Sequence, residues 1–182
     1  MFNRFNKSFK PQFHPERLDE PMRFKKPSRI FVGSVTDMFA DWMPEENVHK
    51  TLEIVKQCPQ HTFLFLTKSP NNYHHFKFPD NCWCGATYTG EKPNNYPIYR
   101  KVQNLFWSFE PIIEPLDDYW FNGWDKWIII GAMTGKFAKH YPVAKETIEK
   151  IIEATRHYNK PLFMKSNLKP YWNGELIQEY PG

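Results

Sequence analysis

One stretch, residues 127–135, constrains the fold of this 182-residue chain more than any other. It reads Trp-Ile-Ile-Ile-Gly-Ala-Met-Thr-Gly, an unbroken apolar run that ends abruptly in small residues. A strand with one face in water would alternate polar and apolar side chains. Four large apolar residues in a row therefore indicate a strand covered on both faces, as in a parallel sheet flanked by helices. The small residues that follow allow a tight turn and the close approach of a ligand to the backbone.

The same pattern recurs along the chain: an apolar strand, a small or charged residue, a loop and then a helix-like segment. The expected strands are residues 29–35, 61–67, 82–90, 105–109, 127–130 and 161–165, with a weaker candidate near 9–14. The expected helices are residues 44–57, 96–103 and 144–158. Repeated βα units imply parallel strands joined by right-handed crossovers.

Two architectures accommodate such repeats, an open doubly wound sheet and a (β/α) barrel. No Gly-x-Gly-x-x-Gly motif follows any expected strand, so the dinucleotide-binding fingerprint is absent from the sequence. Several strands instead end in a polar or charged residue, and a barrel would bring those ends to one mouth, where the active sites of barrels lie. We therefore expect an α/β protein with a TIM-like (β/α) barrel of parallel strands, as a single domain over residues 1–182.

Composition excludes several other classes of protein. Aromatic residues make up 18% of the chain, too many for a disordered protein, and three cysteines argue against a disulfide scaffold. No apolar run approaches the roughly 20 residues that span a bilayer, and the first residues lack the apolar core of a signal peptide, so we expect a cytoplasmic protein without a membrane partner. Residues 1–28 form a basic N-terminal segment, which is either a solvated rim or a patch that faces a polyanion.

Polar and charged residues stand at or just past the C-terminal ends of different strands. A single Lys or Glu in such a place normally caps or solvates the strand, but a barrel would gather all of them into one volume. Two glycines of the turn after residue 130 and one asparagine after the last strand complete the set. The candidate ligand-binding residues are Asp37, Lys68, Thr87, Glu110, Gly131, Thr134, Gly135, Lys165 and Asn167.

Glu110 is the sharpest of these candidates, because it follows an apolar strand and precedes a proline that fixes its backbone. Lys165, after Leu-Phe-Met, is its counterpart. Two interpretations stay open: a Lys–Glu ion pair that closes the mouth, or a site that binds a polar small molecule. The sequence assigns a catalytic role to neither residue.

The cysteines and histidines do not predict a metal site. Cys82 and Cys84 share one face of a strand, Cys58 ends a helix, and none has the Cys-x-x-Cys spacing of a zinc or redox site. We expect buried, inert thiols, and we expect His74 and His75 to be solvated in their polar loop. A Gly-x-Ser-x-Gly elbow, a P-loop and a His-Glu-x-x-His motif are also absent.

Short blocks, spread in order over nearly the whole chain, carry a family resemblance. They are Pro-Glu-Arg-Leu-Asp-Glu-Pro (15–21), Arg-Ile-Phe-Val (29–32), Ser-Val-Thr-Asp-Met-Phe (34–39), Gln-His-Thr-Phe (60–63), Leu-Thr-Lys (66–68), Phe-Glu-Pro (109–111), Ile-Gly-Ala-Met-Thr-Gly (130–135) and Phe-Met-Lys-Ser-Asn-Leu (163–168). The ordered set resembles a phage- and bacterium-encoded family of radical S-adenosylmethionine-like proteins that is carried as a domain of unknown function.

The resemblance implies S-adenosylmethionine as a ligand and also reveals a departure. Such proteins carry a Cys-x-x-x-Cys-x-x-Cys loop upstream of the Pro-Glu-Arg-Leu block, where three thiolates hold a 4Fe–4S cluster. No cysteine precedes Cys58 here, so we expect this chain to lack the first barrel strand and the cluster loop and the barrel to be incomplete. Either Met1 is an internal start within a longer gene, or this version has lost the cluster. A cluster is expected only if an N-terminal segment supplies the cysteines.

Two functions from different classes follow. The first is that of the C-terminal part of a radical S-adenosylmethionine-like protein of unassigned substrate, without cluster chemistry in this chain. The second is a cluster-free module that binds a small molecule or, with weaker support, nucleic acid. Because a missing strand leaves unpaired strand edges, we also expect either a covering segment from residues 1–28 or self-association across the gap.

Overall fold

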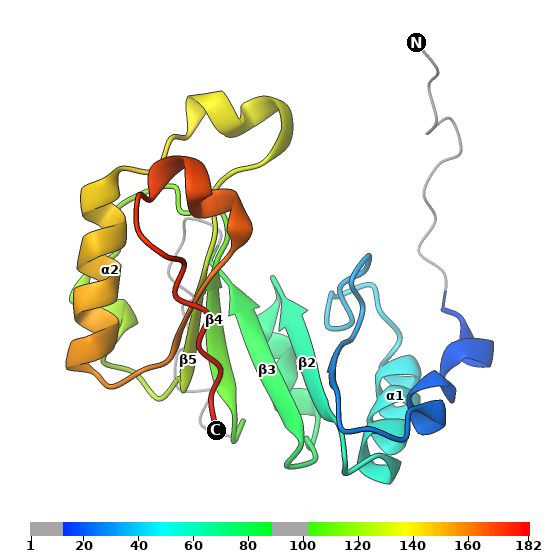
Figure 1. Cartoon of the computed structure of the whole chain (residues 1–182). Helices are drawn as coiled ribbons and strands as arrows, with labels where there is room; N and C mark the ends of the chain where they lie inside the picture. Colours follow the sequence, from blue (N-terminus) through cyan, green and yellow to red (C-terminus); the bar gives the residue numbers. More distant parts are fainter. Residues whose placement is uncertain (1–12, 89–101) are drawn as a thin grey trace.

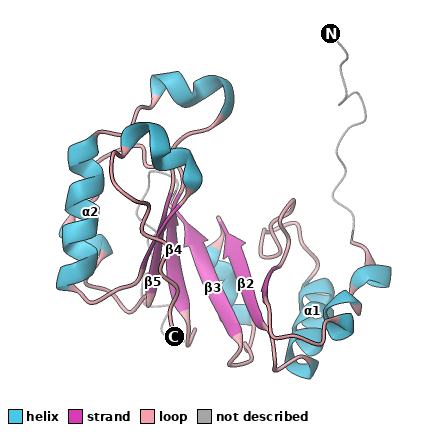
Figure 2. Ribbon diagram, in the orientation of Figure 1, coloured by secondary structure: helices cyan, strands magenta, loops and turns pink. Residues whose placement is uncertain are grey.

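A six-stranded sheet organises the structure, a computed structural model in which residues 13–88 and 102–182 are described (Figures 1 and 2). All neighbouring strands are parallel, and their order in the sheet is their order in the chain. They curl into a half-barrel, so the expected partial TIM-like barrel is confirmed. The strands are β1 (Arg29–Phe31), β2 (Thr62–Thr67), β3 (Cys82–Thr87), β4 (Leu105–Phe109), β5 (Trp127–Ile130) and β6 (Leu162–Met164).

The strands and helices lie close to where the sequence predicts them. Helices α1 (Glu45–Gln57) and α2 (Lys145–His157) fall within the expected segments. β1 is shorter than expected, because Gly33 has a φ of 72° and the chain turns there, with Thr36 N donating to Gly33 O. The weak strand near 9–14 and the helix at 96–103 fall largely outside the described residues.

The two helices cover one face of the sheet. Their buried side chains form a single apolar cluster with alternate residues of the strands, such as Phe63 and Phe65 of β2. This alternation follows from the strand geometry, which sends successive side chains to opposite faces. The buried apolar positions of the helices are Val48, Leu52 and Val55 of α1 and Ile148 and Ile151 of α2.

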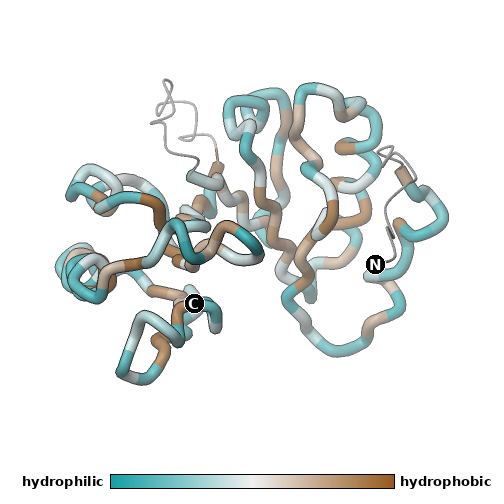
Figure 3. The backbone as a smooth tube through the Cα atoms, turned by 90° about the horizontal axis from the view of Figure 1, so that it is seen from above, coloured by the Kyte–Doolittle hydropathy of each residue, from teal (hydrophilic) through white to brown (hydrophobic). Residues whose placement is uncertain are grey.

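The opposite face, which is the interior of the half-barrel, carries a second cluster. Trp83, Phe106 and Trp127 are its buried members. Gly85 makes room for the Phe106 ring, since a β-carbon at this glycine would lie 2.2–2.7 Å from three ring carbons. Seen from above in Figure 3, apolar segments gather toward the middle of the molecule and the outer turns are mainly hydrophilic. Both faces of the central strands are thus covered, as the apolar runs predict.

The C-terminal residues cover the outer edge of β6. The Met164 amide donates to Ile177 O at 2.7 Å, and the Glu179 amide donates to Leu162 O at 2.9 Å. The pairing is antiparallel. At β6 the edge is therefore covered by residues 177–179, while cover of the β1 edge from residues 1–28 stays a prediction.

The tail then crosses the interior face. The Trp127 indole donates to Glu179 O at 3.0 Å, and the ring of Tyr180 lies 5.2 Å from that of Phe163. The guanidinium carbon of Arg29, in β1, lies 3.6 Å from the centre of the Tyr180 ring. This cation–π contact joins the first strand to the end of the chain.

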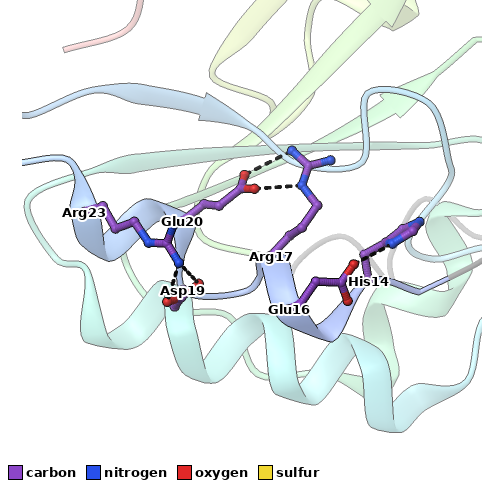
Figure 4. Close-up of polar contacts among 6 residues, drawn as sticks. All are labelled: His14, Glu16, Arg17, Asp19, Glu20 and Arg23. Carbon is purple, nitrogen blue, oxygen red and sulfur yellow. Dashed lines mark hydrogen bonds and ion pairs between the residues drawn. The ribbon is translucent and has the colours of Figure 1, made fainter.

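The described part of the basic N-terminal segment neutralises much of its own charge. Two short 3-10 helices, η1 (Pro15–Arg17) and η2 (Glu20–Arg23), hold local ion pairs (Figure 4). Arg17 Nε lies 2.8 Å from a Glu20 oxygen, and Arg23 Nη2 lies 2.9 Å from an oxygen of Asp19. All four side chains are exposed or half-exposed. This pairing favours the solvated rim over the polyanion-facing patch.

Candidate ligand-binding site at the strand ends

The C-terminal ends of β4, β5 and β6 bring three predicted residues together. Lys165 Nζ lies 2.5 Å from Glu110 Oε2, and the Ser108 hydroxyl donates to the same oxygen at 3.2 Å. Gly131 lies against the Glu110 side chain. The parallel register sets these strand ends side by side. The ion pair that the sequence offered as one of two roles for Glu110 is therefore present.

This ion pair is accessible to water. The Lys165 side chain is 45% exposed and that of Glu110 is 20% exposed. Exposed ion pairs are screened and contribute roughly 0–1 kcal/mol to stability. The pair therefore stands at a wet mouth, where a ligand can reach both charges, and does not seal a dry core.

The position of the Glu110 side chain requires a glycine at residue 131. A β-carbon at this glycine would lie 2.7 Å from Glu110 Cγ and 2.8 Å from Glu110 Oε1. The glycine backbone is held on both sides, because its amide donates to Phe109 O and its carbonyl accepts from the Ile112 amide. The sequence led us to expect that this glycine admits a ligand to the backbone. In the structure the Glu110 side chain takes that space.

Asn167 positions the loop that follows β6. Its side-chain amide donates to Ala132 O at 2.9 Å, and its Oδ1 accepts from the Ala132 amide at 3.1 Å. The Lys165 amide donates to Ile130 O at 2.9 Å. These bonds tie the end of β6 to the end of β5 and fix the start of the Lys165 side chain. Asn167 thus acts on the mouth through the backbone.

Asp37 and Lys68 meet at the ends of β1 and β2. Asp37 Oδ2 accepts from the Lys68 amide at 2.9 Å, and its Oδ1 accepts from the Phe39 amide at 3.0 Å. The carboxylate therefore holds two loops by their backbones. The Lys68 side chain is exposed at the same edge of the sheet.

Thr87 belongs to the interior face. It ends β3 and pairs in register with Ser108 of β4, and both follow the inward positions of Gly85 and Phe106 by strand alternation. Thr87, Ser108 and Glu110 therefore line one rim. That a single ligand contacts this rim together with Lys68 stays a prediction.

Thr134 and Gly135 do not join this group. Both are exposed, and Gly135, with a φ of 72°, begins the 3-10 helix η6 (Gly135–His140). Within the described residues, neither makes a hydrogen bond or ion pair to Glu110 or Lys165. They stand on the loop that leaves the mouth.

Sequence reasoning missed Ser108, although a signal was present. It is the one polar residue in Leu-Phe-Trp-Ser-Phe, and it is buried. A buried hydroxyl needs a hydrogen-bond partner, and the next polar side chain on the same face is that of Glu110. The sequence therefore contains enough information to predict a hydrogen bond between Ser108 and Glu110.

A second ion pair, also missed, lies at the opposite ends of the strands. Lys160 Nζ is 2.7 Å from Asp125 Oδ2, with side-chain exposures of 8% and 0%, and it also donates to Gly123 O at 3.1 Å. Burial raises the pKa of Asp125, while the Lys160 ammonium acts in the opposite direction. Because the N-terminal face of a barrel serves stability, we interpret this pair as structural.

The cysteines do not fit an iron–sulfur cluster. Cys58, Cys82 and Cys84 are all buried. Burial raises the pKa of Cys82 to about 12 and that of Cys84 well above its ordinary value, which disfavours the thiolates that hold iron. In residues 13–88 and 102–182, no group of three or more His, Cys, Asp or Glu side chains could hold a metal ion.

A hollow lies among the residues that follow β6. It begins at Ser166, the residue after Lys165, and has a volume of about 540 Å³. Trp172 and Leu176 supply apolar surface, and Lys169 and Glu175 supply charge. The C-terminal residues therefore line a space of the size that small-molecule sites have.

In the described part of the chain, no helix has the length and apolar character needed to cross a bilayer.

Comparisons with known proteins identify the family. Neither a curated protein nor a solved structure matches the chain. The family described as Protein of unknown function (DUF5131) matches residues 2–172, nearly the whole sequence. The chain therefore belongs to the DUF5131 family.

Proposed function

We propose that this chain binds S-adenosylmethionine through the accessible Glu110–Lys165 pair at the mouth of its half-barrel. The observation that carries the proposal is a carboxylate and an ammonium 2.5 Å apart, both reached by water, at the C-terminal ends of parallel strands. The sequence resemblance to radical S-adenosylmethionine-like proteins supports this choice of ligand.

The charges of the pair complement those of the ligand. The methionine moiety of S-adenosylmethionine carries an α-ammonium and an α-carboxylate. Glu110 would accept from the α-ammonium and Lys165 would donate to the α-carboxylate, as charge-assisted hydrogen bonds. Because a screened ion pair is weak, separating the two side chains costs little, and the ligand restores both contacts.

The hollow lined by Ser166, the residue after Lys165 in the chain, would take the rest of the ligand. Its volume of about 540 Å³ lies within the roughly 300–1,000 Å³ of small-molecule sites. Trp172, on its wall, offers an aromatic surface for the adenine ring. The proposal therefore places the amino-acid moiety at the strand ends and the adenosine moiety against the C-terminal residues.

We assign no cluster chemistry to this chain, because its cysteines do not fit an iron–sulfur site. The alternative function is a cluster-free module that binds a different polar small molecule at the same mouth. The two functions share residues and differ in the ligand, so ligand identity separates them.

Isothermal titration with S-adenosylmethionine, methionine and adenosine tests the proposal. We expect binding of S-adenosylmethionine, and at least a tenfold loss of affinity in Glu110→Gln and in Lys165→Met. The matched controls are Glu149→Gln and Lys145→Met, which change an exposed ion pair of the same type, 2.9 Å long, on α2. Circular dichroism checks that each variant is folded.

Two results would overturn the proposal. If the wild-type chain binds neither S-adenosylmethionine nor methionine, the mouth is not a site for this amino-acid moiety. If the mouth variants bind as tightly as the α2 controls, the ligand does not use the Glu110–Lys165 pair.

A further inference from the structure

Residues 135–141, named here the basic-aromatic loop, form an exposed projection that the proposed function does not use. They comprise η6 and the residue after it, and they rise above the C-terminal ends of the strands, in yellow at the top of Figure 1. Phe137 is 52% exposed and Tyr141 is 44% exposed. Two exposed aromatic rings therefore stand within five residues of each other on one short loop.

Basic residues lie on the same loop as both rings. Lys136, Lys139 and His140 belong to the same loop and are exposed, and Lys136 Nζ lies 4.9 Å from the centre of the Phe137 ring. The sequence has no acidic residue between Asp125 and Glu146. The loop therefore offers positive charge and flat apolar surface together.

This combination matches single-stranded nucleic acid, and we propose that the basic-aromatic loop binds it. Unpaired bases stack on aromatic side chains, while the phosphates contact neighbouring Lys residues. A duplex keeps its bases stacked and offers only phosphates. An acidic protein would likewise use the Lys residues and leave Phe137 and Tyr141 without a role.

The basic-aromatic loop follows β5, one of the strands that end at the mouth. Four residues separate the end of that strand from the loop. Two further exposed cations, Lys165 and Lys169, follow the neighbouring strand β6. A single strand held by the loop would therefore run along the rim next to the Glu110–Lys165 pair, within reach of whatever the mouth binds.

Fluorescence anisotropy with a labelled oligothymidylate of about 20 nucleotides, longer than the roughly 4–16 nucleotides covered by one single-strand-binding fold, tests this inference. The full chain should bind at low salt. The double variant Phe137→Ala/Tyr141→Ala should lose at least tenfold in affinity with an unchanged salt dependence. The double variant Lys136→Ala/Lys139→Ala should reduce the slope of log K against log salt by about 1.4, for two phosphate contacts.

Matched controls lie away from the loop. Trp42→Ala removes a ring of similar exposure, 52%, and Lys56→Ala removes an exposed cation on α1. Both should bind the oligonucleotide as the wild type does. All loop variants should keep their affinity for S-adenosylmethionine, so that failure of this inference and failure of the proposed function are distinguishable.

Three outcomes would overturn the inference. The first is that the wild-type chain does not bind the oligonucleotide at low salt. The second is that a duplex of equal length binds as tightly. The third is that polyglutamate competes as well as the oligonucleotide and the aromatic double variant binds normally, which would indicate a surface for acidic proteins.

Discussion

The side chain of Glu110 fills the space that any larger residue at position 131 would need. Glu110 Cγ lies 2.7 Å, and Oε1 2.8 Å, from the place of a β-carbon on Gly131. The two residues stand at the ends of neighbouring strands, and both strand ends are fixed by backbone hydrogen bonds. A larger residue at position 131 would therefore displace the Glu110 side chain and break its ion pair with Lys165.

Gly131→Ala should displace Glu110 and destabilise the chain by about 1–3 kcal/mol, the usual cost of overpacking. It should also weaken S-adenosylmethionine binding as Glu110→Gln does. Urea unfolding and titration measure the two effects. Adding Glu110→Ala removes the crowding atoms, so the double variant should be more stable than Gly131→Ala alone. Additive losses in this cycle would contradict the contact.

Replacing one residue of the buried Asp125–Lys160 pair should lower the free energy of unfolding, whereas replacing both residues should lower it far less. Lys160→Met leaves a buried carboxylate without its partner and should cost on the order of 3–5 kcal/mol. Asp125→Leu together with Lys160→Met removes both charges and should restore most of the loss. Urea unfolding of the three proteins checks this. A single variant with the wild-type midpoint would show that the pair is not buried in solution.

The C-terminal tail should loosen in acid through Glu179. The hydrogen bonds from Arg156, at 2.7 and 2.8 Å, lower the pKa of Glu179 below 4.5. A lowered pKa gives stability that is present above pH 4.5 and is lost as the pH falls through the folded-state pKa. The protection factor of the Met164 amide, which donates to Ile177 O, should therefore fall in that range, measured relative to the intrinsic exchange rate at each pH.

Glu179→Gln provides the control for the tail. It should already show fast exchange of Met164 near neutral pH, with little further change in acid beyond the intrinsic exchange rate. Equal protection in the wild type and in this variant at pH 7 would mean that the carboxylate does not hold the tail.

The cysteines should react slowly while the chain is folded. The raised pKa values of Cys82 and Cys84 leave little thiolate at pH 8, and Cys58 is buried as well. A thiol reagent should label all three rapidly only in urea. Anaerobic reconstitution with iron and sulfide should give no stoichiometric cluster, and one cluster per chain by iron and sulfide analysis would refute this.

The sheet was predictable because its signals are local. The apolar runs at 105–109 and 127–130 can be covered only from both sides, and their abrupt ends mark the strand ends. The residues just past those ends, such as Glu110 and Lys165, follow from strand direction alone. Their pairing was one of two open alternatives, since the sequence does not fix side-chain distances.

The features that sequence reasoning missed depend on contacts between distant segments. Asp125 and Lys160 are far apart in sequence, and each resembles an ordinary surface charge until the fold buries it. Residues 177–179 are too few to show the alternation of polar and apolar residues that predicts a strand. Their pairing with β6 therefore could not be predicted from the sequence. The reason for a glycine at residue 131 could not be predicted, because it depends on the position of the Glu110 side chain.

The strand order has a consequence for how the chain is made. Each strand pairs with the one before it in sequence, so no strand has to wait for a distant segment to find its place. On a ribosome the sheet can therefore grow one strand at a time, in the direction of synthesis. The residues that pair with β6 and that place Tyr180 against Arg29 emerge after all six strands. The contact between Arg29 in β1 and Tyr180 can thus form only after all six strands have emerged.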